Sequence, residues 1–312
     1  MPDDGASGQD VGTLRIAYDT PRDEARIEQE VTIASSLQPG DTPADGFFGT
    51  DGSRKAFVTL NLYVGFEMAA TRAAAGDGAT FVQTPEMSNL LVKSREDLFA
   101  RLSAPEQDLF LQTACRLASE LRIFLQVGSL AVLTENGKAA NRGFLIAPNG
   151  SILASYDKIH MFDVDLPNGE SWRESATYEA GGQTVVADLP FARLGLAICY
   201  DIRFPAIFRT QSRAGAEILT APAAFTRQTG KAHWHVLQRA RAIENGAFVV
   251  SSAQGGLHED GRETFGHSLV VDPWAAYDSS RCLPTHLRLP LAVNEVLAQA
   301  FPEYGRTQLR YR

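Results

Sequence analysis

From Val58 onward, short apolar runs alternate with longer amphipathic stretches. Short apolar runs bounded by turn residues are typical of buried strands, whereas apolar spacings of three and four residues indicate helices. Strands are predicted over 79–87, 123–133, 193–201, 217–225, 247–254 and 265–273, with a hairpin over 141–158 that turns at Pro148-Asn149-Gly150. Helices are predicted over 60–76, 103–121, 206–215 and 232–245. This alternation predicts an α/β layered fold.

The first 55 residues have a different pattern. The stretch SLQPGDTPADGFFGTDGSRK is rich in Gly, Pro, Asp and Ser and has little periodic apolar signal. Residues 1–55 are therefore predicted to be irregular or poorly ordered, except for a short strand at Thr13–Tyr18. No shift in composition divides the remainder, so residues 56–312 are predicted to form a single domain. Its C-terminal tail, from about residue 275, is atypical.

Composition restricts the partners that we expect. The chain has 29 Lys and Arg residues against 37 Asp and Glu, a formal charge of −8, and no basic run, which argues against nucleic acid or an anionic membrane as a partner. No stretch approaches the length of an apolar membrane span, and the first ten residues do not resemble a secretory signal. The three cysteines form no disulfide framework. We therefore expect a reduced, cytoplasmic protein.

The sharpest local feature is the segment GLAICYDIRFPAIF, in which an apolar run ends at Cys199 and a helix is predicted to follow. A thiol at a helix N-terminus has its pKa lowered by the helix dipole, which favours the nucleophilic thiolate. Backbone N–H groups at the same turn can stabilise an oxyanion. The alternative is that Cys199 is a small buried hydrophobic residue, as free cysteines often are.

Two other segments place charged residues at the ends of predicted strands. Glu86 follows an apolar strand and Pro85, at a position where open α/β sheets carry their sites. Lys158 ends the second strand of the hairpin and could stabilise an oxyanion from within a dry pocket. Taken alone, each residue is more often a solvated surface residue.

Taken together, the segments TPEM, YDKIHMFD and ICYDIRFP resemble the nitrilase superfamily of carbon–nitrogen hydrolases. The family is recognised by a Glu, a Lys and a Cys in this order, which correspond to Glu86, Lys158 and Cys199. A second family Glu corresponds to Glu174 in WRES. The resemblance covers about Asn61 to Trp274.

The resemblance implies a four-layer αββα sandwich that forms a homodimer across one helical face and uses no metal or organic cofactor. The segments PAAFTRQTGKAHWHVLQRARAIEN and SSAQGGLHEDGRETFGHS resemble the amidase branch, which includes deaminated-glutathione amidases and ω-amidases. The expected activity is hydrolysis of a small carboxamide to an acid and ammonia through a thioester. Two regions depart from the family pattern: residues 44–55, where a first core strand is expected, and the tail after Trp274.

In this mechanism Glu86 acts as base and acid, Cys199 as nucleophile and Lys158 as oxyanion donor, while Glu174 orients Lys158 or the substrate amide. The oxyanion would also receive the backbone N–H of Tyr200. Arg203 would bind a substrate carboxylate or, as we favour, brace the turn internally. Candidates for the pocket wall are Met87, Phe162 and Phe225, and the alternative for each is ordinary core packing.

Two other functions remain open at this point. A nitrilase or an N-carbamoyl amide hydrolase would use the same four residues. A non-catalytic scaffold would keep the fold, but it would have no need of all four. The six histidines show no zinc-type spacing, and the chain contains neither a GxSxG motif nor a Gly-rich phosphate loop.

Overall fold

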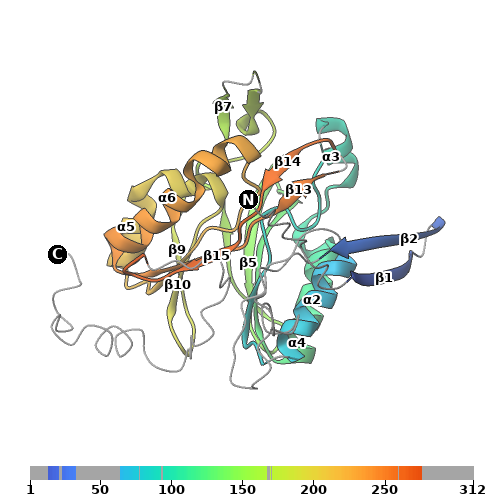
Figure 1. Cartoon of the computed structure of the whole chain (residues 1–312), viewed down its shortest axis with the longest axis horizontal. Coiled ribbons are helices and arrows are strands. Elements are labelled where there is room, and N and C mark those ends of the chain that lie inside the picture. The colour runs from blue at the N-terminus through green and yellow to red at the C-terminus, as the bar shows by residue number, and fades with distance from the viewer. Residues whose placement is uncertain are drawn as a thin grey trace, which may run out of the picture.

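The computed structural model describes residues 13–20, 23–32 and 64–275, except 77, 93, 167, 168, 170 and 259. The tail beyond residue 275, Cys282 and the segment 44–55 lie outside the described residues. The four-layer αββα sandwich is confirmed: two sheets pack face to face, and helices cover the outer face of each sheet (Figure 1).

The first sheet has the order β3-β4-β5-β6. Strands β3 and β4 are parallel, and β4, β5 and β6 form antiparallel pairs. The hairpin predicted over 141–158 corresponds to β5 and β6. The strands of this sheet are β3 (Phe81–Gln83), β4 (Phe124–Leu133), β5 (Ala139–Ile146) and β6 (Ile152–Asp157).

The second sheet has the order β15-β12-β11-β10-β9. Its central strands β10, β11 and β12 are parallel, and the two edge strands are antiparallel to their neighbours. The predicted strand 193–201 ends earlier than expected, because the chain turns into a short 3-10 helix at Cys199. The strands are β9 (Val185–Asp188), β10 (Arg193–Leu196), β11 (Ile218–Thr220), β12 (Phe248–Ser251) and β15 (Leu269–Val271).

Each helical layer packs on one sheet. Helices α2 (Val64–Gly76) and α4 (Leu109–Leu121) cover the first sheet, and α5 (Pro205–Arg213) and α6 (Arg227–Asn245) cover the second (Figure 1). Helix α4 begins at Asp108, whose carboxylate accepts the Leu111 N–H, and α6 ends at Gly246 in the left-handed conformation. Strand β4 is buried along almost its whole length because a helix layer covers one face and the second sheet covers the other.

The two sheets are joined at their centre by buried polar side chains as well as by apolar packing. Gln83 donates to Gln126, which in turn donates to Thr220 on the second sheet. Ser252 donates its backbone N–H to Gln83. These buried polar groups are therefore satisfied across the sheet interface, and they fix how the two sheets sit against each other.

Several short elements were not predicted. They have few apolar positions, so they carry little periodic signal. They are α3 (Arg95–Arg101), the 3-10 helices η2 (Glu174–Ala176) and η3 (Cys199–Arg203), and the strands β7 (Asp163–Asp165), β8 (Ser171–Arg173), β13 (Gly255–Leu257) and β14 (Glu263–Phe265). The helix predicted over 103–121 is divided into the 3-10 helix η1 (Pro105–Gln107) and α4. Strand β9 was also missed.

Near the N-terminus, β1 (Thr13–Thr20) pairs antiparallel with β2 (Asp23–Thr32). Strand β1 includes the strand predicted at Thr13–Tyr18, whereas β2 occupies residues that the sequence indicates as irregular. Within the described part of the chain, every helix is too short or too polar to span a bilayer.

Candidate active site

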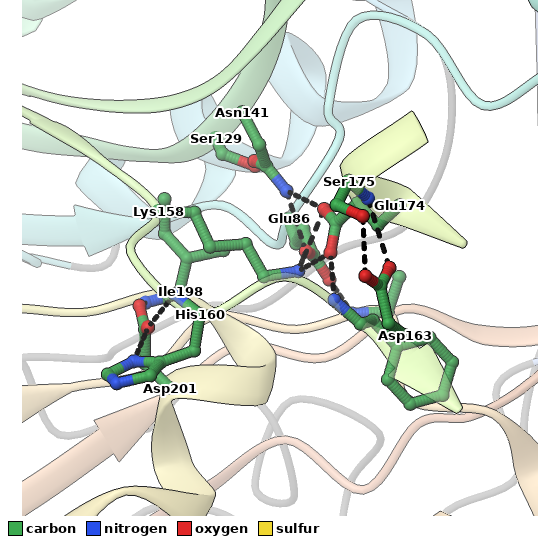
Figure 2. A network of polar contacts seen from close by, with 12 residues as sticks. Glu86, Ser129, Asn141, Lys158, His160, Asp163, Glu174, Ser175, Ile198 and Asp201 are labelled. Atoms are coloured by element: carbon green, nitrogen blue, oxygen red, sulfur yellow. Dashed lines mark hydrogen bonds and ion pairs between the residues drawn. The ribbon is translucent and has the colours of Figure 1, made fainter. Parts of the chain in front are cut away.

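The four charged or nucleophilic residues singled out in the sequence line one cavity. Figure 2 shows three of them, Glu86, Lys158 and Glu174, side by side. Glu86 follows β3 and Lys158 follows β6, both in the first sheet. Cys199 begins η3 after β10 of the second sheet, and Glu174 begins η2 in the connection between the sheets. The site thus forms where strand ends of both sheets meet.

The Lys158 ammonium lies between two carboxylates. Its Nζ is 3.0 Å from Glu86 Oε1 and 2.9 Å from Glu174 Oε2. The side chains of Lys158 and Glu86 are 2% and 5% exposed, so this ion-paired group is shielded from water. Buried charges persist only when they are paired and hydrogen-bonded, and here both carboxylates have further donors.

Those donors fix the orientation of both carboxylates. Asn141 Nδ2 donates to Glu86 Oε1 at 2.9 Å and to Glu174 Oε1 at 3.2 Å. The backbone N–H of Ala224 donates to Glu86 Oε2 at 2.7 Å, and that of Phe162 donates to Glu174 Oε2 at 2.6 Å. Sequence reasoning missed Asn141, although a polar residue within the buried run of β5 is a detectable signal.

Cys199 is held in a strained backbone conformation. Its φ of 47° lies in the left-handed region, which costs a non-glycine residue on the order of 1–3 kcal/mol. Its backbone N–H donates to Pro222 O at 2.9 Å, which ties the turn to the end of β11. The thiol is buried, and the Glu86 carboxylate is close enough to affect its pKa.

The expectation of a resting thiolate is wrong. Burial raises the pKa of the Cys199 thiol well above its ordinary value, and the neighbouring Glu86 carboxylate raises this pKa further. Lys158 and the Ala224 N–H act in the opposite direction without offsetting these effects. The thiol is therefore protonated at neutral pH.

The charged partners of Cys199 remain ionised. Burial alone would raise the pKa of Glu86, but the charge of Lys158, the nearby Cys199 thiol and the hydrogen bonds from Lys158 and Asn141 outweigh burial and lower this pKa. Burial alone would likewise lower the pKa of Lys158, but Glu174, Glu86 and Cys199 raise it well above its ordinary value. The site thus combines a carboxylate, an ammonium and a thiol within contact of one another.

The buried carboxylate of Asp201 stabilises the turn that begins at Cys199. Asp201 Oδ2 accepts the Tyr156 hydroxyl at 2.7 Å and the Ile198 N–H at 2.9 Å. Asp201 Oδ1 accepts the backbone N–H of His160 at 3.0 Å and lies 2.7 Å from its ring Nδ1 (Figure 2). Asp201 therefore links the segment that carries Cys199 to the segment that carries Lys158.

A cavity of about 480 Å³ opens over this group. Glu86, Lys158, Glu174 and Cys199 all line it, and so do the predicted wall residues Met87 and Phe162. The lining also includes residues that sequence reasoning did not single out, among them Arg95, Trp172, Arg173, Tyr178 and Arg262.

The other three predicted binding residues are not among those that line the cavity. Phe225 is buried and packs edge-to-face on Trp234, with ring centroids 5.0 Å apart. The Arg203 guanidinium lies over the rings of Tyr200 and Phe225 and contacts His233 Nδ1 at 3.3 Å, which favours the bracing role. Tyr200 is the second residue of η3, where backbone N–H groups have no intrahelical acceptor.

No cluster of three or more His, Cys, Asp or Glu side chains suited to hold a metal ion occurs within the described residues.

Comparison with known proteins agrees with this geometry. A family model described as carbon–nitrogen hydrolase matches residues 61–277. A deaminated glutathione amidase of Synechocystis sp. is 45% identical over 206 residues, which cover 64% of this chain and 75% of that protein. The deaminated glutathione amidase of Mus musculus is 40% identical over 206 residues, which cover 64% of each chain.

Solved structures show the same fold. The NitFhit protein of C. elegans matches with a TM-score of 0.65 and 30% identity, covering 80% of this chain and 62% of that one. Saccharomyces cerevisiae Nit3, a member of branch 10 of the nitrilase superfamily, matches with a TM-score of 0.64 and 25% identity, covering 80% of this chain and 90% of that one.

Proposed function

The chain belongs to the carbon–nitrogen hydrolase family, and from this premise we propose that it hydrolyses a small carboxamide to a carboxylic acid and ammonia through a thioester on Cys199. The observation that carries the proposal is that the buried Cys199 thiol and the ionised Glu86 carboxylate line one cavity, with the Lys158 ammonium 3.0 Å from the same carboxylate. This arrangement supplies a nucleophile, its base and an electrostatic donor in one buried place.

In the first half-reaction the thiol proton passes to Glu86 as the sulfur attacks the amide carbonyl. The negative charge that develops on the oxygen is stabilised by Lys158 and the backbone N–H of Tyr200. Protonated Glu86 then gives its proton to the leaving nitrogen, and ammonia departs. Because the resting thiol is protonated, this transfer takes place during attack and does not precede substrate binding.

In the second half-reaction Glu86, again a carboxylate, takes a proton from water as the water attacks the thioester. The tetrahedral intermediate then collapses to the carboxylic acid, and Glu86 returns its proton to the departing sulfur, which regenerates the thiol and the carboxylate. Glu174 touches Lys158 through both carboxylate oxygens, at 3.0 and 2.9 Å, and its role is to hold the ammonium in place. The reaction needs no cofactor.

The substrates that we propose are deaminated glutathione, whose leaving group is cysteinylglycine in place of ammonia, or the ω-amide of a keto acid, which releases ammonia. The support is that the relatives reported above are named deaminated glutathione amidase. A cavity of about 480 Å³ lies within the range of small-molecule sites.

The test is hydrolysis by the wild-type protein and by Cys199→Ala, followed as release of cysteinylglycine from deaminated glutathione and as release of ammonia from the other compounds. The substrate panel contains deaminated glutathione, α-ketoglutaramate, an aliphatic amide, an N-carbamoyl amino acid and a nitrile. We expect release from one of the first two, and its loss in Cys199→Ala with an unchanged melting temperature. Release that persists in Cys199→Ala contradicts the mechanism. Preferred turnover of the nitrile or the carbamoyl compound assigns the chain to another activity of the family, and a folded protein without any release favours a scaffold.

We also propose that the protein is a cytoplasmic homodimer that associates through a helical face. The described cysteines Cys115 and Cys199 are free thiols, which suits a reducing compartment. Helix α6 exposes Val236 and Ile243, which are 68% and 52% accessible. These residues are seven positions apart and so lie on one side of the helix.

A further inference from the structure

The cationic side chains that line the catalytic cavity differ in how far they are exposed to solvent. The buried end holds Lys158, whose side chain is 2% exposed. Three arginines also line the cavity, and the exposed fractions of their side chains increase outward: Arg262 is 20% exposed, Arg173 is 50% exposed and Arg95 is also exposed. A substrate that reaches the thiol thus extends past cationic side chains.

Two of these arginines already have interaction partners within the protein. Arg173 Nη2 donates to both oxygens of Asp165, at 2.8 and 2.9 Å, and Arg173 Nη1 donates to Val164 O and Trp172 O. Arg95 lies over the ring of Phe99, 5.3 Å from its centroid, and is exposed to solvent.

Arg262 is different because it is mostly buried and incompletely bonded. Its Nε is buried and has no hydrogen-bond partner among the described residues. Its Nη2 is 3.5 Å from Asp260 Oδ2, which itself accepts no hydrogen bond there. The guanidinium lies 4.7 Å from the centroid of Trp172, another cavity residue, and stacking of this kind leaves N–H groups at the edge of the guanidinium for a ligand. A buried N–H without an acceptor is costly, so an anion is favoured beside Arg262.

We propose that Arg262 is a specificity-determining residue that binds a carboxylate at the end of the substrate remote from the scissile amide. This inference rests on the proposed amidase function and assigns a residue to the negative charge that both proposed substrates carry. Arginine binds carboxylates through paired N–H donors, which gives both affinity and orientation. Asp260, at 3.5 Å, is the internal carboxylate that the substrate displaces from Arg262.

The experiment compares amides that differ only in a terminal carboxylate: succinamate with butyramide, and glutaramate with pentanamide. Wild type, Arg262→Gln and Arg262→Lys are assayed for ammonia release. In Arg262→Gln we expect KM for the carboxylated amides to rise about 10- to 100-fold with little change in kcat, because a charge-assisted contact is lost. The alkyl amides keep their kinetic constants, and Arg262→Lys gives an intermediate KM.

The matched control is Arg227→Gln. Arg227 pairs with Glu263 next to the Arg262 loop, is exposed and does not line the catalytic cavity. This variant changes the net charge by the same amount, and we expect both amide series to be unaffected. An equal rise in KM for both amide series in Arg262→Gln overturns the proposal. A rise in KM for the carboxylated amides in Arg227→Gln overturns it as well.

A binding measurement separates this inference from the catalytic mechanism. Succinamate and butyramide are titrated by calorimetry into Cys199→Ala and into the double variant Cys199→Ala, Arg262→Gln. We expect tighter binding of succinamate, lost in the double variant. Such binding without turnover by the wild type contradicts the amidase function and leaves the Arg262 site standing. Turnover without any dependence on Arg262, or equal binding of the two amides, overturns the Arg262 site alone.

Discussion

At the residue scale, Glu86 has two opposing effects on Cys199. As a proton acceptor it makes attack possible, but its static charge raises the pKa of the thiol. In the wild type the lowered pKa of Glu86 keeps the carboxylate ionised until the pH falls below the usual range for glutamate. We therefore expect amide turnover to be lost only in that acidic range, because protonation removes the base.

Glu86→Gln separates the two effects. It removes the base, so ammonia release should fall by roughly 10²- to 10⁴-fold. It also removes the carboxylate that raises the thiol pKa and leaves Lys158, which lowers it, so alkylation of Cys199 by iodoacetamide should begin at lower pH than in the wild type. Alkylation is followed by mass spectrometry, with the exposed Glu120→Gln as control. If the pH at which half of Cys199 is alkylated is higher in Glu86→Gln than in the wild type, this account of the site is wrong.

The sequence predicted which residues form the site, but it did not predict the protonation state of the thiol. Glu86, Lys158 and Cys199 each follow a strand, and strand ends in layered folds converge, so their proximity was predictable. The state of the thiol was not, because it depends on burial and on contact with Glu86. Arg262 could not be predicted for the same reason. That its Nε lacks a partner follows only from the position of the β13–β14 loop against Trp172.

At the element scale, the position of Glu86 depends on close packing between its loop and β4. Thr84 Oγ1 accepts the Gly128 N–H at 3.1 Å, and Ser88 donates its N–H to Ser129 O at 2.9 Å. A Cβ at Gly128 would lie 2.2 Å from Thr84 O and 2.5 Å from Pro85 O, both backbone atoms that cannot rotate away. Only glycine therefore allows the loop to approach β4 this closely.

Gly128→Ala should displace the loop and Glu86 with it. We expect a loss of about 1–3 kcal/mol in the free energy of unfolding, as for other overpacked sites, together with at least a roughly tenfold fall in kcat/KM. Gly182→Ala is the control, because nothing lies within 4 Å of its added Cβ. Urea denaturation and ammonia release measure the two effects. Unchanged activity in Gly128→Ala would show that Glu86 does not depend on this contact.

Which elements could be predicted follows from their length and burial. The predicted strand over 123–133 and helix over 232–245 correspond to long elements with clear apolar patterns, β4 and α6. Strands β7 and β8 have only three residues each and no fully buried side chain, so periodicity could not reveal them. They nevertheless carry Trp172 and Arg173 into the cavity lining.

At the scale of the whole molecule, alternating elements predicted the layered fold, but not the order of the strands. In the second sheet, β12 lies between β11 and β15, and β9 lies at the opposite edge beside β10. The antiparallel pair of β9 and β10 is a local hairpin, but the parallel pairs of β10 with β11 and of β11 with β12 join segments separated by a helix, and no local pattern encodes them. They bring the end of β10, with Cys199, and the end of β11, with Ala224, to Glu86 from the first sheet.

The exposed face of α6 gives the last prediction. If Val236 and Ile243 meet a second copy, the double variant Val236→Glu, Ile243→Glu places carboxylates in an apolar interface where they lack partners, which strongly disfavours association. Light scattering coupled to gel filtration should then show a dimer for the wild type and a monomer for the variant. The control is Leu109→Glu, since Leu109 is 73% exposed on α4, in the opposite helical layer. A monomeric wild type, or dissociation in the Leu109 variant alone, would place any interface elsewhere than on α6.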